Sequence, residues 1–370
     1  MEGLLKWGEA ANVRMKLLPE LTAGPGRTEA DIAALKAGGL PLVLYGDGWY
    51  APYVRRFLAR RGLTAAACFA DDGFTATAGT VSFDEIRRRY EKFNIVIAFA
   101  DAGLAGKKLA KKDRGQVAGV YFFDVMGELL ECGLDRAYVE RHGAELETVY
   151  ALLGDELSRR TYAAFLNAKL GEPEGLREVW RKDQYFPEGI ITLSEREVFV
   201  DGGAYTGDTL LAFIRKAKNK YARCCAFEPE PANAASLRAL AGRQGFRDVE
   251  IIAKGLWSKA ATLRFTAAEG TAGSAVSAAG ALSIEAAAID ELAPDATFIK
   301  LDVEGAELEA LKGAAATIKR NRPKLAVCLY HKPGDLFEIP LFIKSLAPEY
   351  RLYLRQHQPV SCELVLYAVI

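Results

Sequence analysis

A strand, a glycine turn and the start of a helix follow one another directly within residues 198–218. The apolar strand ends at Asp201, and Gly202 and Gly203 form a tight turn after it. Gly207 then opens an apolar segment that is expected to be helical. Glycine has no Cβ, so its backbone lets a ligand approach closely. The order of strand, glycine turn and helix predicts a nucleotide-binding crevice in an α/β fold.

The charges around this turn indicate which ligand the crevice takes. A pyrophosphate prefers bare N–H groups at a helix start, whereas Asp201 ends the strand here and Asp208 stands at the helix mouth. Two carboxylates repel phosphate and suit a cation. S-adenosylmethionine carries an ammonium and a sulfonium and has no phosphate, so the pattern favours this methyl donor over NAD. Glu228 follows the second strand, where an acidic residue binds a ribose diol.

Strands and helices alternate through the rest of this half, which predicts a parallel sheet. The final two strands are expected to form an antiparallel pair at the edge of that sheet, and a hairpin insert is expected at residues 262–277. The total is seven strands in a Rossmann-like layout. The strands after the first are expected at residues 222–227, 249–252, 297–302, 324–330, 350–355 and 363–369.

Four stretches occur in a fixed order along this half. They read Phe-Val-Asp-Gly-Gly-Ala-Tyr-Thr-Gly-Asp-Thr at the first strand, Phe-Glu-Pro at the second, Phe-Ile-Lys-Leu-Asp-Val-Glu-Gly-Ala-Glu at the fourth and Pro-Lys-Leu-Ala-Val-Cys-Leu-Tyr-His-Lys-Pro-Gly-Asp-Leu at the fifth. Residues 195–370 thereby resemble the FkbM-type family of S-adenosylmethionine-dependent methyltransferases. The resemblance implies O-methylation of hydroxyls on sugars, glycans or polyketide-like products. It places donor contacts at Asp201, Gly203, Gly207, Glu228 and Asp302.

Further donor contacts are expected next to these positions. An adenine is expected near the short segment after the third strand, at Gly255, Leu256 and Trp257. The others are Gly202, Tyr205, Asp208 and Pro229.

Methylation of an alcohol requires removal of a proton, so a base is expected near the acceptor. His331 follows the fifth strand at the expected mouth of the crevice, with Asp335 as its orienting carboxylate. A purely structural role of His331 in the loop stays open, and Glu304 is an alternative base. Glu307 needs no role beyond the favourable position of an acid at a helix start.

A metal site is an alternative use of the same residues. Asp302, Glu304 and His331 offer ligands for Mg²⁺, which prefers oxygen, but we expect no metal. The other two histidines are expected away from the chemistry, with His142 on a surface helix and His357 solvated in the last hairpin turn.

A second glycine loop occurs in the N-terminal half. Residues 42–51 read Leu-Val-Leu-Tyr-Gly-Asp-Gly-Trp-Tyr-Ala, a strand followed by Gly-x-Gly-x-x-Ala, and the next strand ends in Asp71-Asp72. This pattern is typical of dinucleotide binding and leaves open an NAD(P)-dependent oxidoreductase. However, Asp47 would repel a pyrophosphate, and Trp49 is bulky for a close approach. We therefore favour a Rossmann-like module that docks, dimerises or helps to shape the acceptor site.

These observations divide the chain into a Rossmann-like α/β domain at residues 1–125, a helical linker at 126–185 and the methyltransferase domain at 186–370. Every donor motif lies in the last part, so that fragment is expected to bind the donor alone. A non-catalytic protein that retains the donor fold is a third alternative.

The composition of the chain argues against several classes of function. Lys and Arg total 48 and balance 48 Asp and Glu, which argues against nucleic acid as a partner. No apolar run approaches the length of a membrane span, and the six cysteines lack paired spacing, so a cytoplasmic protein is expected. The acceptor is expected to be a small molecule or glycan, and a homo-oligomer stays open.

Overall fold

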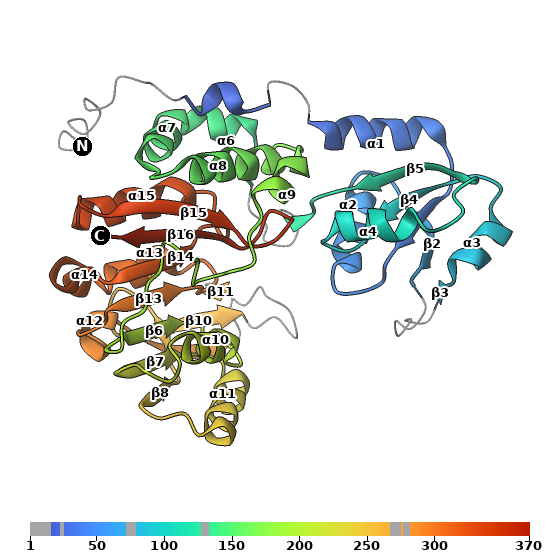
Figure 1. The fold of residues 1–370 in the computed structure, drawn as a ribbon. Coiled ribbons are helices and arrows are strands. Elements are labelled where there is room, and N and C mark those ends of the chain that lie inside the picture. Colours follow the sequence, from blue (N-terminus) through green and yellow to red (C-terminus); the bar gives the residue numbers. More distant parts are fainter. Residues whose placement is uncertain (1–15, 23–25, 72–78, 127–132, 267–274, 277–281) are drawn as a thin grey trace.

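The computed structural model describes residues 16–22, 26–71, 79–126, 133–266, 275–276 and 282–370. A smaller α/β part, a layer of helices and a larger α/β part follow one another along the chain (Figure 1). The smaller part lies on the right of Figure 1, and the helices α6, α7 and α8 lie above the larger sheet. The α/β class predicted from alternating strands and helices is confirmed.

The smaller part contains a five-stranded sheet with the order β3-β2-β1-β4-β5, in which every pairing is parallel. Its central strands β1 and β4 are apolar apart from Asn94 and are buried along their whole length, as expected when helices cover both faces. The strands are β1 (Leu42–Tyr45), β2 (Ala65–Phe69), β3 (Thr80–Val81), β4 (Phe93–Ile97) and β5 (Val117–Phe122), and the helices are α1 (Arg27–Gly38), α2 (Ala51–Arg60), α3 (Phe83–Arg89) and α4 (Ala102–Leu109).

The helical layer follows the smaller sheet in sequence. Its longest helix begins where the Asp155 side chain accepts a hydrogen bond from Ser158 N, which satisfies a free amide of the first turn. The backbone amides of Leu17 and Leu18 donate to the Glu147 carboxylate, so the start of the described chain packs on this layer. The elements are η2 (Leu18–Glu20), α6 (Arg136–Arg141), α7 (Gly143–Leu152), α8 (Glu156–Lys169), η3 (Pro173–Gly175) and α9 (Leu176–Val179).

The larger part contains a seven-stranded sheet with the order β15-β16-β14-β13-β6-β7-β8. The predicted number of strands is correct, and the final two strands form the expected antiparallel pair at the edge of the sheet. β16 is antiparallel to both of its neighbours and lies inside the sheet, whereas the edge strand β15 runs parallel to the central strands. The strands are β6 (Val198–Gly202), β7 (Arg223–Phe227), β8 (Val249–Ile252), β13 (Phe298–Leu301), β14 (Lys324–Cys328), β15 (Arg351–Gln356) and β16 (Leu364–Val369).

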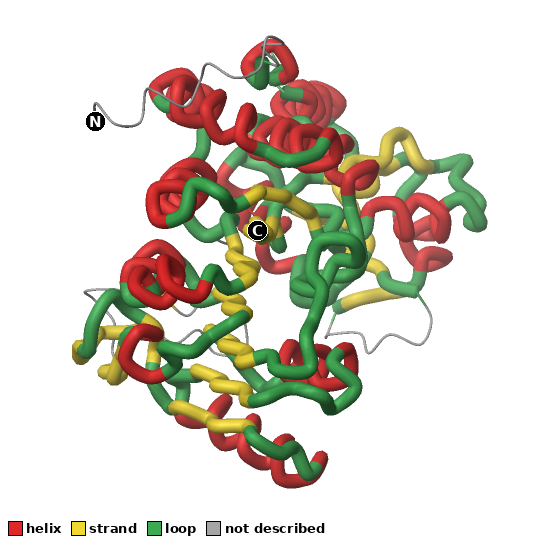
Figure 2. Tube along the Cα trace, turned by 60° about the vertical axis from the view of Figure 1, so that its left-hand side comes forward, coloured by secondary structure: helices red, strands yellow, loops and turns green. Residues whose placement is uncertain are grey.

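The helices of the larger part connect these strands, and Figure 2 shows them along both faces of the twisted sheet. They are α10 (Asp208–Lys216), α11 (Pro231–Gln244), α12 (Ile289–Leu292), α13 (Glu307–Lys312), α14 (Ala315–Asn321) and α15 (Asp335–Leu346).

The helical layer covers the β15 edge of the larger sheet. Gly154 N donates to Leu352 O at 2.7 Å, and Arg181 N donates to Gln356 O at 2.8 Å. The buried hydroxyl of Tyr162 donates to Leu336 O. The first two hydrogen bonds satisfy backbone groups that an open edge would expose, and the third joins the layer to α15.

The expected insert forms part of a small third sheet with the order β11-β10-β12-β9. The predicted hairpin pairs β10 with β11, and β10 also pairs with β12. Residues 267–274 and 277 of the insert lie outside the described residues. The strands are β9 (Gly255–Leu256), β10 (Ala261–Thr266), β11 (Ala275–Val276) and β12 (Leu282–Ala287).

Two findings concern the chain as a whole. Among the described helices, none combines the length and the apolar character that crossing a membrane requires. The five cysteines in the described ranges are all free and buried.

Candidate active site

The carboxyl ends of four adjacent strands, β14, β13, β6 and β7, meet at one edge of the larger sheet. Gly202 pairs in register with Leu301 on one side and with Phe227 on the other. The next residue of each strand, Gly203, Asp302 or Glu228, therefore lies at the same level. Open α/β sheets bind ligands at this edge.

The glycine turn lies directly against the end of β13. Gly203 has a φ of 75°, and a Cβ there would lie 1.8 Å from the backbone oxygen of Asp302. Gly207 has a φ of 97°, and a Cβ there would lie 2.6 Å from a methyl group of Leu237. Asp302 N donates to Gly202 O at 3.1 Å. Only glycine fits both positions, because an added Cβ would overlap the end of β13 at Gly203 and the Leu237 side chain at Gly207.

Asp201 lies beneath this turn and not on its surface. Its side chain is fully buried, and Oδ1 lies 3.1 Å from Nζ of Lys300. The same ammonium donates to the carbonyls of Gly202 and Gly203. The prediction that Asp201 is a free charge that selects a cationic ligand is therefore wrong, because Lys300 neutralises the Asp201 carboxylate. A lysine in the middle of the buried strand β13 was the signal for this partner.

Glu228 stands at the end of β7 beside the turn. Its Oε2 accepts from Tyr205 N at 2.8 Å, and its Oε1 accepts from Glu230 N at 2.9 Å, across Pro229. Burial raises the pKa of this carboxyl. Two backbone amides thus orient the carboxylate, and each oxygen keeps a lone pair for a ligand.

The remaining expected donor contacts differ in exposure. Tyr205 and Asp208 are exposed at the start of α10. Leu256 is buried against the turn, since a Cβ on Gly202 would lie 2.7 Å from its methyl group. Gly255 belongs to β9 with Leu256. The Trp257 side chain is half-buried, and its backbone N donates to Ala287 O; donor contacts by these residues stay predictions.

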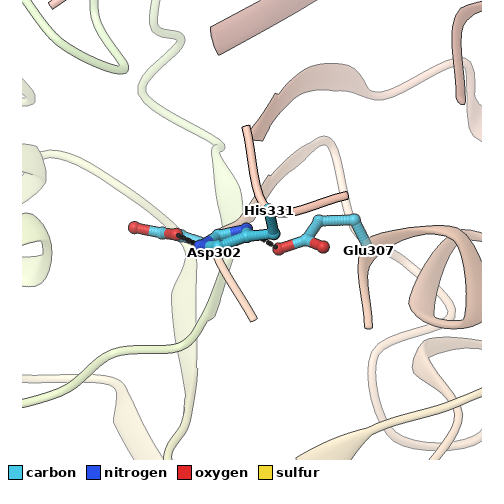
Figure 3. A group of neighbouring side chains, drawn as sticks. All are labelled: Asp302, Glu307 and His331. Carbon is cyan, nitrogen blue, oxygen red and sulfur yellow. Dashed lines mark ion pairs between the residues drawn. The ribbon is translucent and has the colours of Figure 1, made fainter. Parts of the chain in front are cut away.

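His331 lies between carboxylates at the end of β14 (Figure 3). Its Nε2 lies 3.7 Å from Oδ1 of Asp302 and 3.3 Å from Oε2 of Glu304. On the other side of the ring, Nδ1 lies 2.9 Å from Oε1 of Glu307. Glu307 is fully buried and also accepts from Val303 N.

The expected orienting role of Asp335 is therefore corrected. Its Oδ2 accepts from Lys332 N at the start of α15, and Glu307 is the carboxylate beside Nδ1 of His331. Burial, followed by the charge of Glu307, raises the pKa of Asp335 to about 7. Glu307 therefore does more than occupy a favourable position at a helix start, since it also contacts His331. Local sequence did not predict this contact.

The carboxylates dominate the electrostatics of this cluster. Burial opposes the charge on His331, but Glu307, Glu304 and Asp302 outweigh it and raise the pKa of the imidazole well above its usual range. Burial also opposes ionisation of Asp302, yet Lys300 and His331 hold its pKa below the usual value. The carboxylates thus favour the protonated form of the imidazole.

Sequence reasoning missed a group of polar side chains beside Asp302. The hydroxyl of Tyr185 donates to Oδ2 of Asp302 at 2.8 Å, and that of Tyr330 donates to Oδ1 at 3.2 Å. Glu363, in the turn of the last hairpin, lies 3.3 Å from the same Tyr330 hydroxyl, and burial together with the charge of Asp302 raises the pKa of Glu363 to about 7. These residues come from three distant segments, and only Tyr330, adjacent to His331, had a local signal.

The other two histidines do not belong to this cluster. His357 was expected to be solvated, and this is wrong, since it is buried with Nε2 2.8 Å from the hydroxyl of Tyr367. Its Nδ1 lies 2.9 Å from Arg181 O. His142 is half-buried and stacks on Phe337.

The charged side chains around the N-terminal glycine loop are paired with other residues of the smaller part. Asp71, at the end of β2, accepts from the hydroxyl of Tyr45 and pairs with Lys108 and Lys112. This is the position at which a dinucleotide site grips ribose. Asp72 lies outside the described residues.

The residues of the glycine turn itself also contact other side chains of the smaller part. A Cβ on Gly46 would lie 2.7 Å from the ring of Phe99. Asp47 accepts from the hydroxyl of Thr80 and lies 3.5 Å from Arg55. These contacts disfavour dinucleotide binding, and with it the oxidoreductase alternative.

Comparisons with known proteins agree with the position of these motifs. Residues 201–358 match the family model for the methyltransferase FkbM domain. The crystal structure of methyltransferase FkbM from Methylobacillus flagellatus KT is similar with a TM-score of 0.72 and 25% identity, over 95% of each chain. No curated protein matched the sequence.

Two further solved structures are more distant. An rRNA methylase from Streptococcus thermophilus has 14% identity over 48% of this chain and 87% of its own, with a TM-score of 0.32. Precorrin-6y C5,15-methyltransferase from Geobacter metallireducens GS-15 has 14% identity over 52% of this chain and 94% of its own, with a TM-score of 0.30. Neither likeness is strong enough to support an argument. Residues 201–358, with their glycine turn and strand order, form a methyltransferase domain of the FkbM family.

Proposed function

We propose that the protein is an S-adenosylmethionine-dependent O-methyltransferase that acts on a hydroxyl of a sugar, glycan or polyketide-like acceptor. The observation that carries the proposal is the carboxylate of Glu228, which two backbone amides hold beside the glycine turn. A ribose diol donates two hydroxyl hydrogens and fits a carboxylate with a lone pair free on each oxygen. The missing Cβ at Gly203 lets the turn lie directly against the end of β13.

The chemistry at the acceptor supports a neutral, hydroxylated molecule. Asp302, Tyr330 and Glu363 offer hydrogen-bonding groups at the end of the sheet. The carboxylates of Glu304 and Glu307 add negative charge. Such a surface repels phosphate and favours hydroxyl donors, so a small molecule or glycan is proposed as the partner and nucleic acid is not.

The residues of the site have separate tasks in the transfer. When bound, S-adenosylmethionine supplies a methyl group whose bond to sulfur breaks while the acceptor oxygen forms a bond to carbon. The cluster around His331 takes the hydroxyl proton. The surrounding carboxylates raise the pKa of the imidazole, and repulsion from a nearby donor cation lowers it again, which favours the neutral ring that a base requires. Glu307 keeps the ring oriented from Nδ1.

Calorimetry with S-adenosylhomocysteine tests the donor assignment. Glu228→Ala is expected to weaken binding at least tenfold, because a charged acceptor contributes roughly 1.5–3 kcal/mol. Glu230→Gln is the matched control, since its carboxylate interacts with Asn233 and not with the turn. Equal affinity in the Glu228→Ala variant and the wild type would rule out the ribose assignment.

A second measurement separates an enzyme from a binding protein. Release of S-adenosylhomocysteine is followed with a panel of polyhydroxylated acceptors, and turnover with at least one of them is expected. Donor binding without turnover on any acceptor would favour the non-catalytic alternative. We also propose the cytoplasm as the location, from the six cysteines without paired spacing.

A further inference from the structure

We propose that Asp302, Glu304 and Nε2 of His331 bind a divalent cation of the Mg²⁺ and Mn²⁺ class, on which the acceptor hydroxyl is activated. The inference deepens the proposed function and rests on it. It concerns the side of the imidazole that faces Asp302 in Figure 3.

The distances suit shared ligands of one ion. Two ligands at right angles on an ion with bonds of ~2.1 Å lie ~3.0 Å apart. Nε2 of His331 lies 3.3 Å from Oε2 of Glu304 and 3.7 Å from Oδ1 of Asp302. Each carboxylate oxygen is thus within an ångström of that ligand spacing from Nε2, and the side chains of Asp302 and Glu304 are 23% and 29% exposed, which leaves a route to the site.

Glu307 supports the site from outside the coordination sphere. Asp302, Glu307 and His331 each offer a ligand atom, and these atoms lie within 4.8 Å of one another. In Figure 3 Glu307 stands on the other side of the imidazole from Asp302, and we assign it to the support of the ring. Glu307 Oε1 lies 2.9 Å from Nδ1. A metal-binding histidine commonly donates its second N–H to such a carboxylate, which fixes the ring for coordination.

Unsatisfied buried atoms point to a missing ligand. His331 is 8% exposed, and Nε2 has no well-oriented hydrogen-bond partner among the described residues. Oε2 of Glu307, which is fully buried, also lacks a partner within the described ranges. Lys300, the nearby cation, is already paired with Asp201. A divalent ion would supply Nε2 with a bond and compensate the excess carboxylates.

The ligand set indicates the ion and its effect. Carboxylates suit Mg²⁺ and Mn²⁺, and a single imidazole is compatible with Mn²⁺ in particular. A cation at this place lowers the pKa of a hydroxyl that binds it. The hydroxyl proton then leaves to water or a carboxylate, and the resulting oxygen is the nucleophile for the methyl carbon.

The test measures binding of Mn²⁺ alone to the full-length protein after treatment with a chelator, by calorimetry and by the loss of the free Mn²⁺ spectrum in electron paramagnetic resonance. One ion per chain is expected. Glu304→Gln is the main variant, because this side chain is partly exposed and its loss leaves the core intact. It is expected to weaken Mn²⁺ binding at least tenfold, as is Asp302→Asn.

Two comparisons sharpen the result. Glu309→Gln removes a carboxylate of α13 that pairs with Lys312, and it is expected to bind Mn²⁺ like the wild type. Glu307→Gln is expected to lower affinity roughly 10- to 100-fold, as loss of a supporting carboxylate does. Absence of Mn²⁺ binding at millimolar concentration, or equal affinity in Glu304→Gln and Glu309→Gln, would overturn the site.

Failure of this inference is separable from failure of the proposed function. Binding of S-adenosylhomocysteine is measured on the same chelator-treated protein. If the donor binds and Mn²⁺ does not, the cation site is wrong and His331 remains the proposed base. If the donor does not bind, the proposed function itself fails, whatever Mn²⁺ does.

Discussion

Lys300 and Asp201 form a buried ion pair beneath the glycine turn, with Nζ 3.1 Å from Oδ1. The lysine also donates to the carbonyls of Gly202 and Gly203, at 3.1 and 2.8 Å. One ammonium thereby joins the end of β13 to the turn after β6. Burial raises the pKa of Asp201 although Lys300 opposes this, and the attraction of Asp201 and Asp302 raises that of Lys300 against the effect of burial.

Breaking this pair from the lysine side is expected to destabilise the protein. Lys300→Met leaves a carboxylate buried without a cation, which typically costs about 3–5 kcal/mol. Urea unfolding measures the loss. Adding Asp201→Asn to this variant removes the unpaired charge and is expected to recover part of the stability; a double variant no more stable than Lys300→Met would contradict the account.

Substitutions around His331 are expected to affect turnover in a definite order. His331→Ala should lower kcat roughly 10²-fold or more, because the proton acceptor or its cation is lost. Glu307→Gln should follow, since Glu307 contacts Nδ1, and Asp335→Asn should have the smallest effect because it accepts from Lys332 N. Steady-state kinetics gives the order, and S-adenosylhomocysteine affinity within about twofold of wild type is the control. A larger defect in Asp335→Asn than in Glu307→Gln would reverse the assignment.

The glycine turn gives a prediction based on steric fit. Gly203→Ala should abolish donor binding or folding, because the Cβ would lie 1.8 Å from the Asp302 carbonyl at a φ of 75°. Gly48→Ala is the control, since no atom lies within 4 Å of the added Cβ and its φ is not positive. Circular dichroism and calorimetry distinguish loss of fold from loss of binding. Wild-type donor affinity in Gly203→Ala would contradict the geometry of the turn.

His357 is expected to make the protein sensitive to acid. Burial lowers the pKa of its imidazole from 6.5 to about 4. Between these values the unfolded chain binds a proton that the folded protein does not, so stability falls as the pH drops from 6.5 to 4, by about 3 kcal/mol. His357→Gln should lose less stability over this range. Urea unfolding at pH 6.5 and at pH 4 measures the loss of stability in the wild type and in His357→Gln. The titrations of all other groups contribute equally to both proteins and cancel in the difference.

Fragments of the chain should differ in their ability to fold. The sequence predicts that residues 186–370 bind the donor alone, but this fragment lacks Gly154 and Arg181, which pair with the β15 edge, and Tyr185, which donates to Asp302. We now expect it to fold poorly, whereas a fragment of residues 133–370 keeps the helical layer and should fold. Circular dichroism and S-adenosylhomocysteine calorimetry on both test this. A folded 186–370 fragment with full donor affinity would restore the original prediction.

Local sequence patterns determined the order of elements and the place of the donor motifs. The strand at residues 249–252 was predicted with its observed bounds, and the glycine turn precedes α10 as expected. These features depend on neighbouring residues, because alternation, apolar runs and positive φ angles act over a few positions. The seven strands and the methyltransferase family followed from the same short motifs in their fixed order.

Only the tertiary structure decided which charges meet. Asp201 is neutralised by Lys300, Glu307 supports His331 in place of Asp335, and His357 is buried against Tyr367. Likewise, β16 lies inside the sheet because it pairs with β14 on one side and with β15 on the other. Each of these depends on contacts between distant segments, and the energy of a charge depends on its burial and its partner. Neither the burial of a charged side chain nor its partner is determined by the residues next to it in sequence.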